Sequence, residues 1–204
     1  MNEAHLEFCA SDAWREIVER FSHLVREALT HHAGKIVKQI GDAFMLVFTD
    51  PTDAVACGIN IADAIAIENH FPTARIGAHH GPLLYREGDY VGTTVNIAAR
   101  IVGVADRNQF LITDALRTSA RMPDDTEVVT LGPPALKGIS GEVVLHVVRH
   151  ARPRPDRVID PVCHMALDPE SATVVASWRA TDYYFCSADC AERFFADPDK
   201  ALAT

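Results

Sequence analysis

The chain has 204 residues, of which 48% are hydrophobic and 23% charged, and its formal net charge is −9 at pH 7. This length suits one ordinary domain plus a small module, and the composition is that of a globular protein. The acidic balance argues against nucleic acid or an anionic membrane surface as the main partner.

The hydrophobic pattern predicts helices and strands in mixed order up to residue 148. Apolar residues recur at three- and four-residue spacing from Asp12 to His31, which predicts an amphipathic helix. The remaining expected elements, in chain order, are a hairpin with strands at 35–39 and 44–48, a helix at 50–67, a strand pair or one long strand at 75–85 interrupted at Gly81-Pro82, a helix at 93–105, and strands at 109–113, 128–131 and 143–148. This order predicts an α+β fold with helices on one face of a sheet.

The C-terminal part differs in composition from the rest. Residues 150–158, HARPRPDRV, contain two prolines and three arginines, which predicts a linker between domains at 1–149 and 159–204. The five cysteines, at positions 9, 57, 163, 186 and 190, form an odd count without a secretion signal, which argues against a disulfide framework. Cys9 and Cys57 are expected to be ordinary core residues.

Targeting signals are not evident in the sequence. The N-terminal stretch MNEAHLEFCASD lacks the basic segment and apolar run of a signal peptide. No segment has the roughly 18 apolar residues of a membrane span. The expected location is cytoplasmic, without membrane attachment.

Two segments, IVKQIGDAFMLVF at 36–48 and GDYVGTTVNIAAR at 88–100, carry the most specific pattern. It consists of Lys38, Asp42, Asp89, Asn96 and Arg100. In order and spacing this pattern resembles the catalytic domain of class III nucleotide cyclases, over about residues 12–148. The resemblance implies a ferredoxin-like cyclase core with helices on a mostly antiparallel sheet. It also implies conversion of ATP or GTP to a cyclic nucleotide and pyrophosphate, in a dimer.

The matched residues would recognise the nucleotide. Lys38 and Asp89 match the family's base-reading pair in adenylate cyclases, and a lysine donor beside an aspartate acceptor complements N1 and the amino group of adenine. ATP is therefore the expected substrate, although a surface lysine and a loop aspartate are the ordinary alternative. By the same resemblance Asn96 would orient the ribose and Arg100 would stabilise the phosphates, four residues apart on one helix face. Lys137, in LKGISGE, falls where the family often has a phosphate-binding lysine.

Asp42 matches one of the family's two metal-binding aspartates, which hold Mg²⁺ or Mn²⁺. A turn aspartate chosen for its local hydrogen bonds is the alternative. The family's other aspartate ends a first strand, which by the family's layout would precede Met1. Catalysis by this chain alone is therefore expected to be impaired. A short strand at Leu6 to Cys9, a partner chain or a natural start further upstream would each fill the gap.

Class III sites form between two chains, and this chain retains the base-reading, ribose and phosphate residues as a set. It is therefore expected to work as a homodimer, or as a heterodimer with a complete cyclase. The alternative is a non-catalytic regulator that binds nucleotide or a partner cyclase and carries a metal-sensing module.

From Asp160 onward the sequence, with DPVCHMALDPESA and YYFCSADCAERFFADPDKAL, resembles the YHS domain, a small metal-associated module. Cys163, Cys186 and Cys190 match its cysteine positions, and His164 stands where glycine is usual. Three thiolates would make a soft site for zinc, copper or iron, with His164 as a candidate fourth ligand. Reduced cysteines packed against aromatic side chains are the alternative. In a further interpretation, metal handling by this module is the main function and the cyclase fold is a dimerisation platform.

Overall fold

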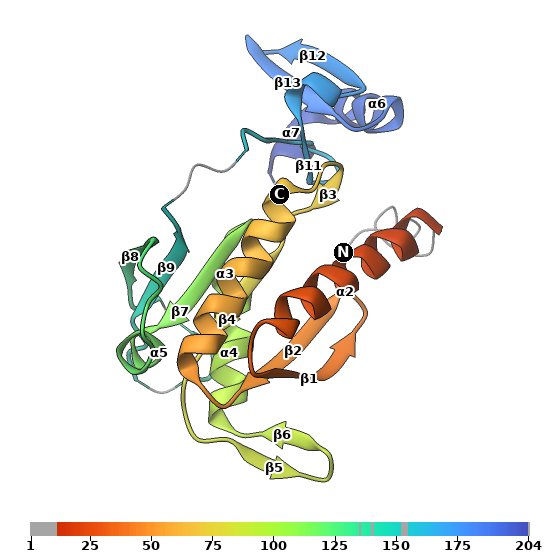
Figure 1. Ribbon diagram of the computed structural model, residues 1–204. Coiled ribbons are helices and arrows are strands. Elements are labelled where there is room, and N and C mark those ends of the chain that lie inside the picture. Colours follow the sequence, from red (N-terminus) through yellow and green to blue (C-terminus); the bar gives the residue numbers. More distant parts are fainter. Residues whose placement is uncertain (1–11, 135, 140, 152–154, 204) are drawn as a thin grey trace. The chain divides into compact units, whose positions relative to one another are not determined.

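The computed structural model describes residues 12–134, 136–139, 141–151 and 155–203. Leu6 to Cys9, the candidate replacement strand, lies outside these described residues. The chain forms two compact units, one of Met1–Ala64 with Ala74–Arg152, the other of Ile65–Thr73 with Pro153–Thr204. Figure 1 labels the elements of both. In the described part of the chain, no helix is long and apolar enough to cross a membrane.

A four-stranded sheet, in the order β4-β7-β9-β8, forms the centre of the first unit. Its strands are β4 (Arg75–Ala78), β7 (Gln109–Thr113), β9 (Leu145–His150) and β8 (Thr126–Gly132). Strands β4 and β7 are parallel, whereas β7–β9 and β8–β9 are antiparallel. The expected mostly antiparallel α+β fold is confirmed.

Helices lie on both faces of this sheet, not on one face as expected. Phe110 and Ile112 of β7 pack with Val55 and Ile59 of α3 (Pro51–Ile67). Leu111, which lies between them and therefore points to the opposite face, packs with Ile97 and Ile101 of α4 (Thr93–Val104). Both faces of β7 are thus buried, which explains its uninterrupted apolar sequence.

The predicted N-terminal helix and hairpin are also present. Helix α2 (Asp12–Thr30) packs on the hairpin of β1 (Gly34–Ile40) and β2 (Ala43–Phe48), where the rings of Phe21 and Phe44 meet edge to face with centroids 5.5 Å apart. Among the described residues, this hairpin has no strand pairing with the four-stranded sheet.

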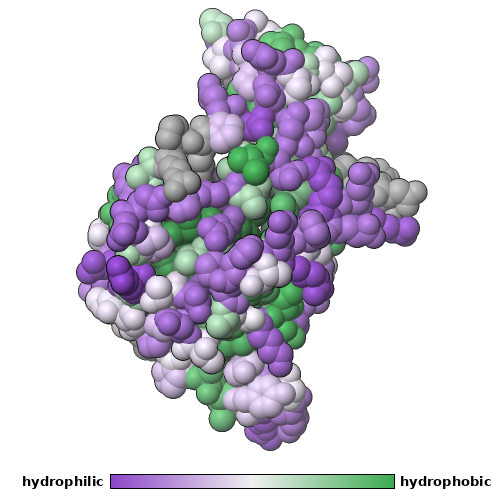
Figure 2. All heavy atoms as spheres, in the orientation of Figure 1, coloured by the Kyte–Doolittle hydropathy of each residue, from purple (hydrophilic) through white to green (hydrophobic). Residues whose placement is uncertain are grey.

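Residues 75–85, expected to form a strand pair or one long strand, do not form the long strand. Strand β4 ends at Ala78, and the chain passes Gly81-Pro82 before it forms a separate hairpin of β5 (Leu84–Arg86) and β6 (Asp89–Val91). Proline has no backbone N–H to continue a ladder, and the Pro82 carbonyl instead accepts a hydrogen bond from Thr94 Oγ1 at 2.6 Å. Hydrophobic side chains are exposed on this hairpin, where Leu84 is 61% exposed (Figure 2). The short helix α5 (Asp114–Ser119) was not predicted.

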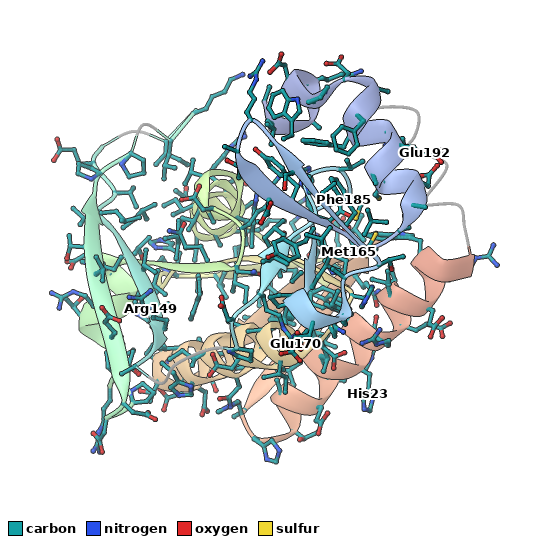
Figure 3. The ribbon with its side chains drawn as sticks, turned by 90° about the horizontal axis from the view of Figure 1, so that it is seen from above. His23, Arg149, Met165, Glu170, Phe185 and Glu192 are labelled. Atoms are coloured by element: carbon teal, nitrogen blue, oxygen red, sulfur yellow. The ribbon has the colours of Figure 1, made fainter. Side chains whose placement is uncertain are left out.

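The second unit contains β3 (Phe71–Pro72), β10 (Val158–Ile159), β11 (Met165–Leu167), a 3₁₀ turn η1 (Pro169–Ser171), the hairpin of β12 (Val174–Trp178) and β13 (Thr181–Phe185), and helices α6 (Ala188–Ala196) and α7 (Pro198–Leu202). Its core is aromatic, because Phe185 and Phe194 are both fully buried. Figure 3 shows Phe185 and Met165 inside this unit, whereas Glu192 projects outward from α6.

Candidate functional site

Lys38 and Asp89, 51 residues apart in the sequence, are brought together in the first unit. Lys38 follows a bulge in β1, and its Nζ donates to Asp89 Oδ2 at 2.5 Å. The other carboxylate oxygen of Asp89 accepts the backbone N–H of Tyr90 at 2.8 Å. The Lys38 hydrogen bond lowers the pKa of Asp89, so the carboxylate stays ionised at neutral pH. Both side chains are about 40% exposed, at 39% and 40%, and so remain accessible to a ligand.

Asn96 and Arg100 lie one turn apart on α4, and both are exposed. Their neighbours Ile97 and Ile101 are buried against the sheet, so the helix is anchored by one face and offers the polar pair on the other. Gly92, which precedes the helix, has φ of 119°, a conformation that a side chain would strain. This glycine lets the chain turn from β6 directly into α4.

Asp42 and Lys137 are exposed as well. Asp42 follows Gly41 in the turn between β1 and β2, and Lys137 lies between β8 and β9. Within the described residues, Asp42 belongs to no group of three or more metal-ligating side chains. The first unit therefore presents its expected nucleotide residues on several elements, with Lys38 and Asp89 in direct contact.

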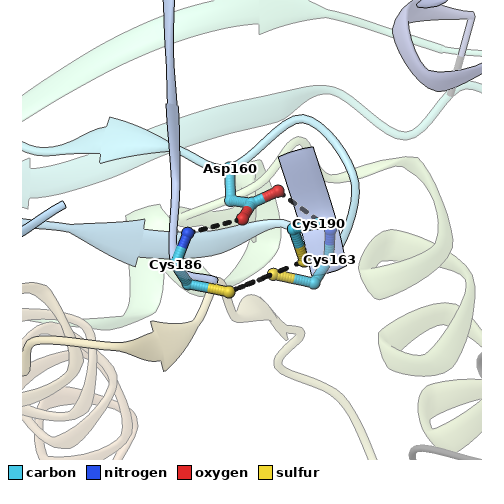
Figure 4. A group of neighbouring side chains, drawn as sticks. All are labelled: Asp160, Cys163, Cys186 and Cys190. Carbon is cyan, nitrogen blue, oxygen red and sulfur yellow. Dashed lines mark hydrogen bonds between the residues drawn. The ribbon is translucent and has the colours of Figure 1, made fainter. Parts of the chain in front are cut away.

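The second unit contains a compact group of metal-ligating atoms (Figure 4). Asp160, Cys163, Cys186 and Cys190 each place one ligand atom so that all four atoms lie within 4.8 Å of one another. The Sγ atom of Cys186 lies 3.5 Å from that of Cys163 and 3.6 Å from that of Cys190. A tetrahedral zinc site with Zn–S bonds of about 2.3 Å separates its sulfurs by about 3.8 Å, so this donor set fits such an ion.

Local structure explains how the three cysteines converge. Ser187 caps α6 by accepting the backbone N–H of Cys190 at 3.2 Å. Cys186 directly follows β13, and Cys163 lies in the turn between β10 and β11. Cys57, by contrast, is fully buried in α3 of the first unit, where burial and the charge of Asp53 raise the pKa of its thiol to about 11.

Asp160 was missed by the sequence analysis. It is fully buried, and its carboxylate accepts backbone N–H groups from Val162 at 2.8 Å, Cys163 at 3.3 Å and Cys186 at 2.8 Å. It therefore fixes the backbone at two of the three cysteines. The available signal was the Asp160-Pro161 pair, because aspartate commonly accepts such bonds in a turn.

His164, the candidate fourth ligand, is not part of the four-residue group found in the described chain. Its backbone N–H donates to the Asp160 carbonyl at 2.9 Å, and its φ is 64°. That left-handed conformation is the one that glycine adopts without strain, which explains why glycine is usual at this position in the YHS domain.

The three thiols do not ionise alike. Hydrogen bonds from Cys163 and Cys186 lower the pKa of Cys190, with Ser187 contributing in the same sense. The same contacts, together with burial, raise the pKa of Cys163. These contacts therefore favour the ionised form at Cys190 and the protonated form at Cys163.

Comparison with known families gives two matches. The adenylate and guanylate cyclase catalytic domain model matches residues 4–150, and the YHS domain model matches residues 158–203. A pH-sensitive adenylate cyclase from Mycobacterium tuberculosis is 32% identical over 151 residues, which cover 72% of this chain and 38% of that protein. An adenylate cyclase from Glutamicibacter nicotianae is 32% identical over 115 residues, or 56% of this chain and 28% of that protein. The chain thus spans less than half the length of these curated relatives.

Solved structures show the same fold. A monomeric adenylate cyclase from Trypanosoma brucei matches with a TM-score of 0.61 and 22% identity, covering 72% of this chain and 84% of that chain. The adenylyl cyclase CyaB from P. aeruginosa matches with a TM-score of 0.55 and 21% identity, covering 71% of this chain and 86% of that chain. Both matches agree with a cyclase-type fold for the part of this chain that they cover.

Proposed function

Because this chain belongs to the adenylate and guanylate cyclase catalytic domain family, we propose that its first unit takes part in converting ATP to cyclic AMP and pyrophosphate. The observation that carries the proposal is the contact between Lys38 and Asp89, 2.5 Å apart and about 40% exposed. A donor and an acceptor held side by side complement the Watson–Crick edge of adenine, and guanine has the opposite polarity at those atoms. This pair would select ATP. On binding, the hydrogen bond between Lys38 and Asp89 would break, and each residue would form a hydrogen bond to the base instead.

Asn96 and Arg100 would act on the sugar and phosphates. In cyclisation the ribose 3′-hydroxyl attacks the α-phosphorus in line, so catalysis depends on positioning and on stabilising charge. Asn96 would hold the ribose through its amide, and the planar guanidinium of Arg100 would stabilise the charge that develops on the phosphates. Lys137, exposed beyond β8, would bind the leaving pyrophosphate as a point charge.

We propose that this site is completed by a second chain. Mg²⁺ or Mn²⁺, when bound, supplies charge neutralisation and activates the attacking hydroxyl. Among the described residues, Asp42 is the one match to the family's two metal-binding aspartates. A single carboxylate binds two divalent ions weakly, because water competes for them. A homodimer would be weak for this reason, whereas a complete cyclase would supply both aspartates opposite Lys38, Asp89, Asn96 and Arg100.

Cyclic AMP production with Mg²⁺ or Mn²⁺ tests this proposal. The chain is assayed alone and mixed with a complete cyclase that has alanines at its own ribose and phosphate positions. Activity that appears only in the mixture, and disappears with Arg100→Ala in this chain, is the expected result. A mixture without activity would contradict the proposal and favour the alternative, a non-catalytic regulator that binds nucleotide or a partner cyclase. Isothermal titration with ATP and GTP would then measure which nucleotide binds.

We also propose that the second unit binds one thiophilic metal ion through Cys163, Cys186 and Cys190, with the Asp160 carboxylate as fourth donor. The support is the 4.8 Å grouping of their ligand atoms. Zinc suits three thiolates and one oxygen best among zinc, copper and iron, because it accepts mixed sulfur and oxygen donors in a tetrahedron. The fit to Asp160 takes the place of the sequence-based candidate His164.

Absorption spectra of the Co²⁺-loaded chain test the ligand set. Intense d–d bands in the red part of the visible spectrum indicate a tetrahedral site. The intensity of the thiolate-to-Co²⁺ charge-transfer band reports the number of sulfur ligands. Asp160→Asn is expected to shift the d–d bands, while His164→Gly leaves them unchanged. The reverse pattern would assign the fourth position to His164. Absence of bands would leave the cysteines as packing residues around Phe185.

A further inference from the structure

The small sheet of the second unit contains a strand from far earlier in the chain. β3 (Phe71–Pro72) pairs with β11 in antiparallel register, with Pro72 opposite Met165 and Phe71 opposite Ala166. Phe71 is 2% exposed, and all three residues of β11 are buried. The YHS model begins at residue 158, so this third strand comes from the region matched by the cyclase model.

Asn69 makes the most specific contacts of this segment. Its Oδ1 accepts the backbone N–H of Asp168 at 2.9 Å, and its Nδ2 donates to Ser171 Oγ at 2.9 Å. Asp168 directly follows β11, and Ser171 ends the 3₁₀ turn η1 that comes next. The Asn69 amide therefore holds the C-terminal end of β11, while the pairing with Phe71 and Pro72 holds the strand itself.

Arg157 adds a second attachment. Its Nη2 donates to the Ile67 carbonyl at 3.0 Å, and its Nη1 lies 3.3 Å from Asp168 Oδ2. The Arg157 side chain is 17% exposed, so these contacts are partly shielded from water. Residues 67–72 are thus attached to the C-terminal part of the second unit at both Ile67 and the β3 strand.

β11 leads directly to the cysteine cluster. The Met165 carbonyl accepts the backbone N–H of Asp160 at 3.0 Å, which closes the turn that carries Cys163. The Asp160 carboxylate in turn holds the backbone N–H groups of Cys163 and Cys186. A displacement of β11 would therefore move Asp160 and, with it, two of the three sulfurs.

We infer that Asn69 is a positioning residue for the cysteine cluster, and that metal binding there is linked to the order of residues 65–73. This inference rests on the proposed metal site. The linkage is reciprocal by thermodynamic necessity: whatever the Asn69 contacts add to metal affinity, the metal adds to the stability of those contacts.

The linkage reaches the cyclase-like part of the sequence through α3. The last turn of α3 lies in residues 65–73, and the same helix supplies Val55 and Ile59 to the core of the first unit. A metal ion at the cluster would therefore change the order of a segment that ends a helix of the cyclase fold. This gives the C-terminal module a physical route to report metal status to the cyclase domain.

Zinc affinity of the full chain tests the inference, with Zn²⁺ alone as the probe and a chromophoric chelator as competitor. Asn69→Ala removes the hydrogen bonds to Asp168 and Ser171, together with the local one from the His70 backbone N–H, and is expected to weaken Zn²⁺ binding about tenfold. Ser171→Ala, at an exposed position, removes one of them and is expected to weaken binding about threefold. Asn60→Ala is the matched control, because Asn60 lies on α3 and contacts His32 in the first unit; it should leave the affinity unchanged.

Hydrogen exchange provides a readout that a merely structural role would not change. Zn²⁺ should slow amide exchange across residues 65–73 in the unsubstituted chain, and Asn69→Ala should reduce this effect. Zinc binding with unchanged affinity in Asn69→Ala and no added protection would overturn the linkage and leave the metal site standing. Failure of the unsubstituted chain to bind Zn²⁺ would overturn the metal site, and the linkage with it.

Discussion

The nucleotide residues of the first unit and the cysteine cluster of the second are built in opposite ways. Asp42, the α4 pair Asn96 and Arg100, and Lys137 are exposed on three different segments, and Lys38 and Asp89 are half-exposed. The cluster instead gathers four ligand atoms within 4.8 Å around the fully buried Asp160. The exposed residues of the first unit, the open site, need a further protein surface to enclose a ligand. The cysteine cluster of the second unit, the closed site, needs only an ion.

The two sites also depend differently on folding. Within the second unit, the Asp160 carboxylate holds the backbone N–H groups of Cys163 and Cys186, and Ser187 Oγ holds that of Cys190, so the geometry exists before the ligand arrives. Lys38 and Asp89 instead bond to each other, and in the proposed function a base would replace this mutual bond. The first site should therefore respond to a partner chain, and the second to metal concentration.

Arg100→Ala should have the largest effect. An arginine that stabilises charge in the transition state is worth about a hundred- to a thousandfold in rate, so cyclic AMP production in the complemented mixture should fall by that factor. Arg117→Ala is the control, because Arg117 lies on α5 and pairs with Asp114. If Arg100→Ala retained activity, the exposed residues of the first unit would not act on the phosphates. The difference in exposure between the two sites would then say nothing about how the first unit works.

Cys190→Ser should weaken zinc binding by about a hundredfold, since it removes a thiolate from the ligand set and disturbs the start of α6. Competition with a chromophoric chelator measures the change. Cys57→Ala provides a cysteine control in the first unit, where the thiol has a pKa of about 11 and stays protonated. Equal losses in both variants would mean that the effect comes from general destabilisation and not from the closed site.

Lys38→Ala should reduce the preference for ATP over GTP by about tenfold, because it removes the donor that faces the adenine acceptor. The ratio of cyclic AMP to cyclic GMP formed by the complemented mixture measures this preference. Lys35→Ala is the matched control on the same strand, at an exposed position. An unchanged ratio in Lys38→Ala would show that base selection comes from the partner chain.

Local patterns predicted much of this structure, and long-range contacts explain what they missed. The amphipathic helix α2 and the β1–β2 hairpin depend on neighbouring residues, so their sequences were sufficient. Strand β3 is two residues long, contains a proline and pairs with β11, which lies more than 90 positions later. No local pattern indicates such a strand. α5 was within reach, because Thr113 and Asp114 are typical of a helix start.

The site residues divide in the same way. Lys38 and Asp89 were found because the family pattern fixes their positions, and the structure then placed them in contact. Asp160 was missed because its importance depends on burial and on bonds to Cys163 and Cys186, which the sequence does not display. Polar residues whose role is to organise other residues are therefore the hardest to recognise before a structure exists.

The smallest expected effect concerns the protonation of Asp89. The hydrogen bond from Lys38 lowers the pKa of this carboxyl from its ordinary value of 3.8, so the pair adds stability above that pH. This contribution is lost as the pH falls through the lowered pKa. Because both side chains are about 40% exposed, water and salt screen the pair, and the change in overall stability should be slight.

Carboxyl NMR titration of Asp89 measures this effect directly. The midpoint should lie below 3.8 in the unsubstituted chain and rise toward that value in Lys38→Met, which keeps the side chain's length without its charge. Added salt should narrow the difference, because the pair is exposed. If the titration midpoint of Asp89 were the same in Lys38→Met as in the unsubstituted chain, Lys38 and Asp89 would not be in contact in solution. The open site would then have no preformed element, and the partner chain would have to arrange the base-reading pair as well as the metal ions.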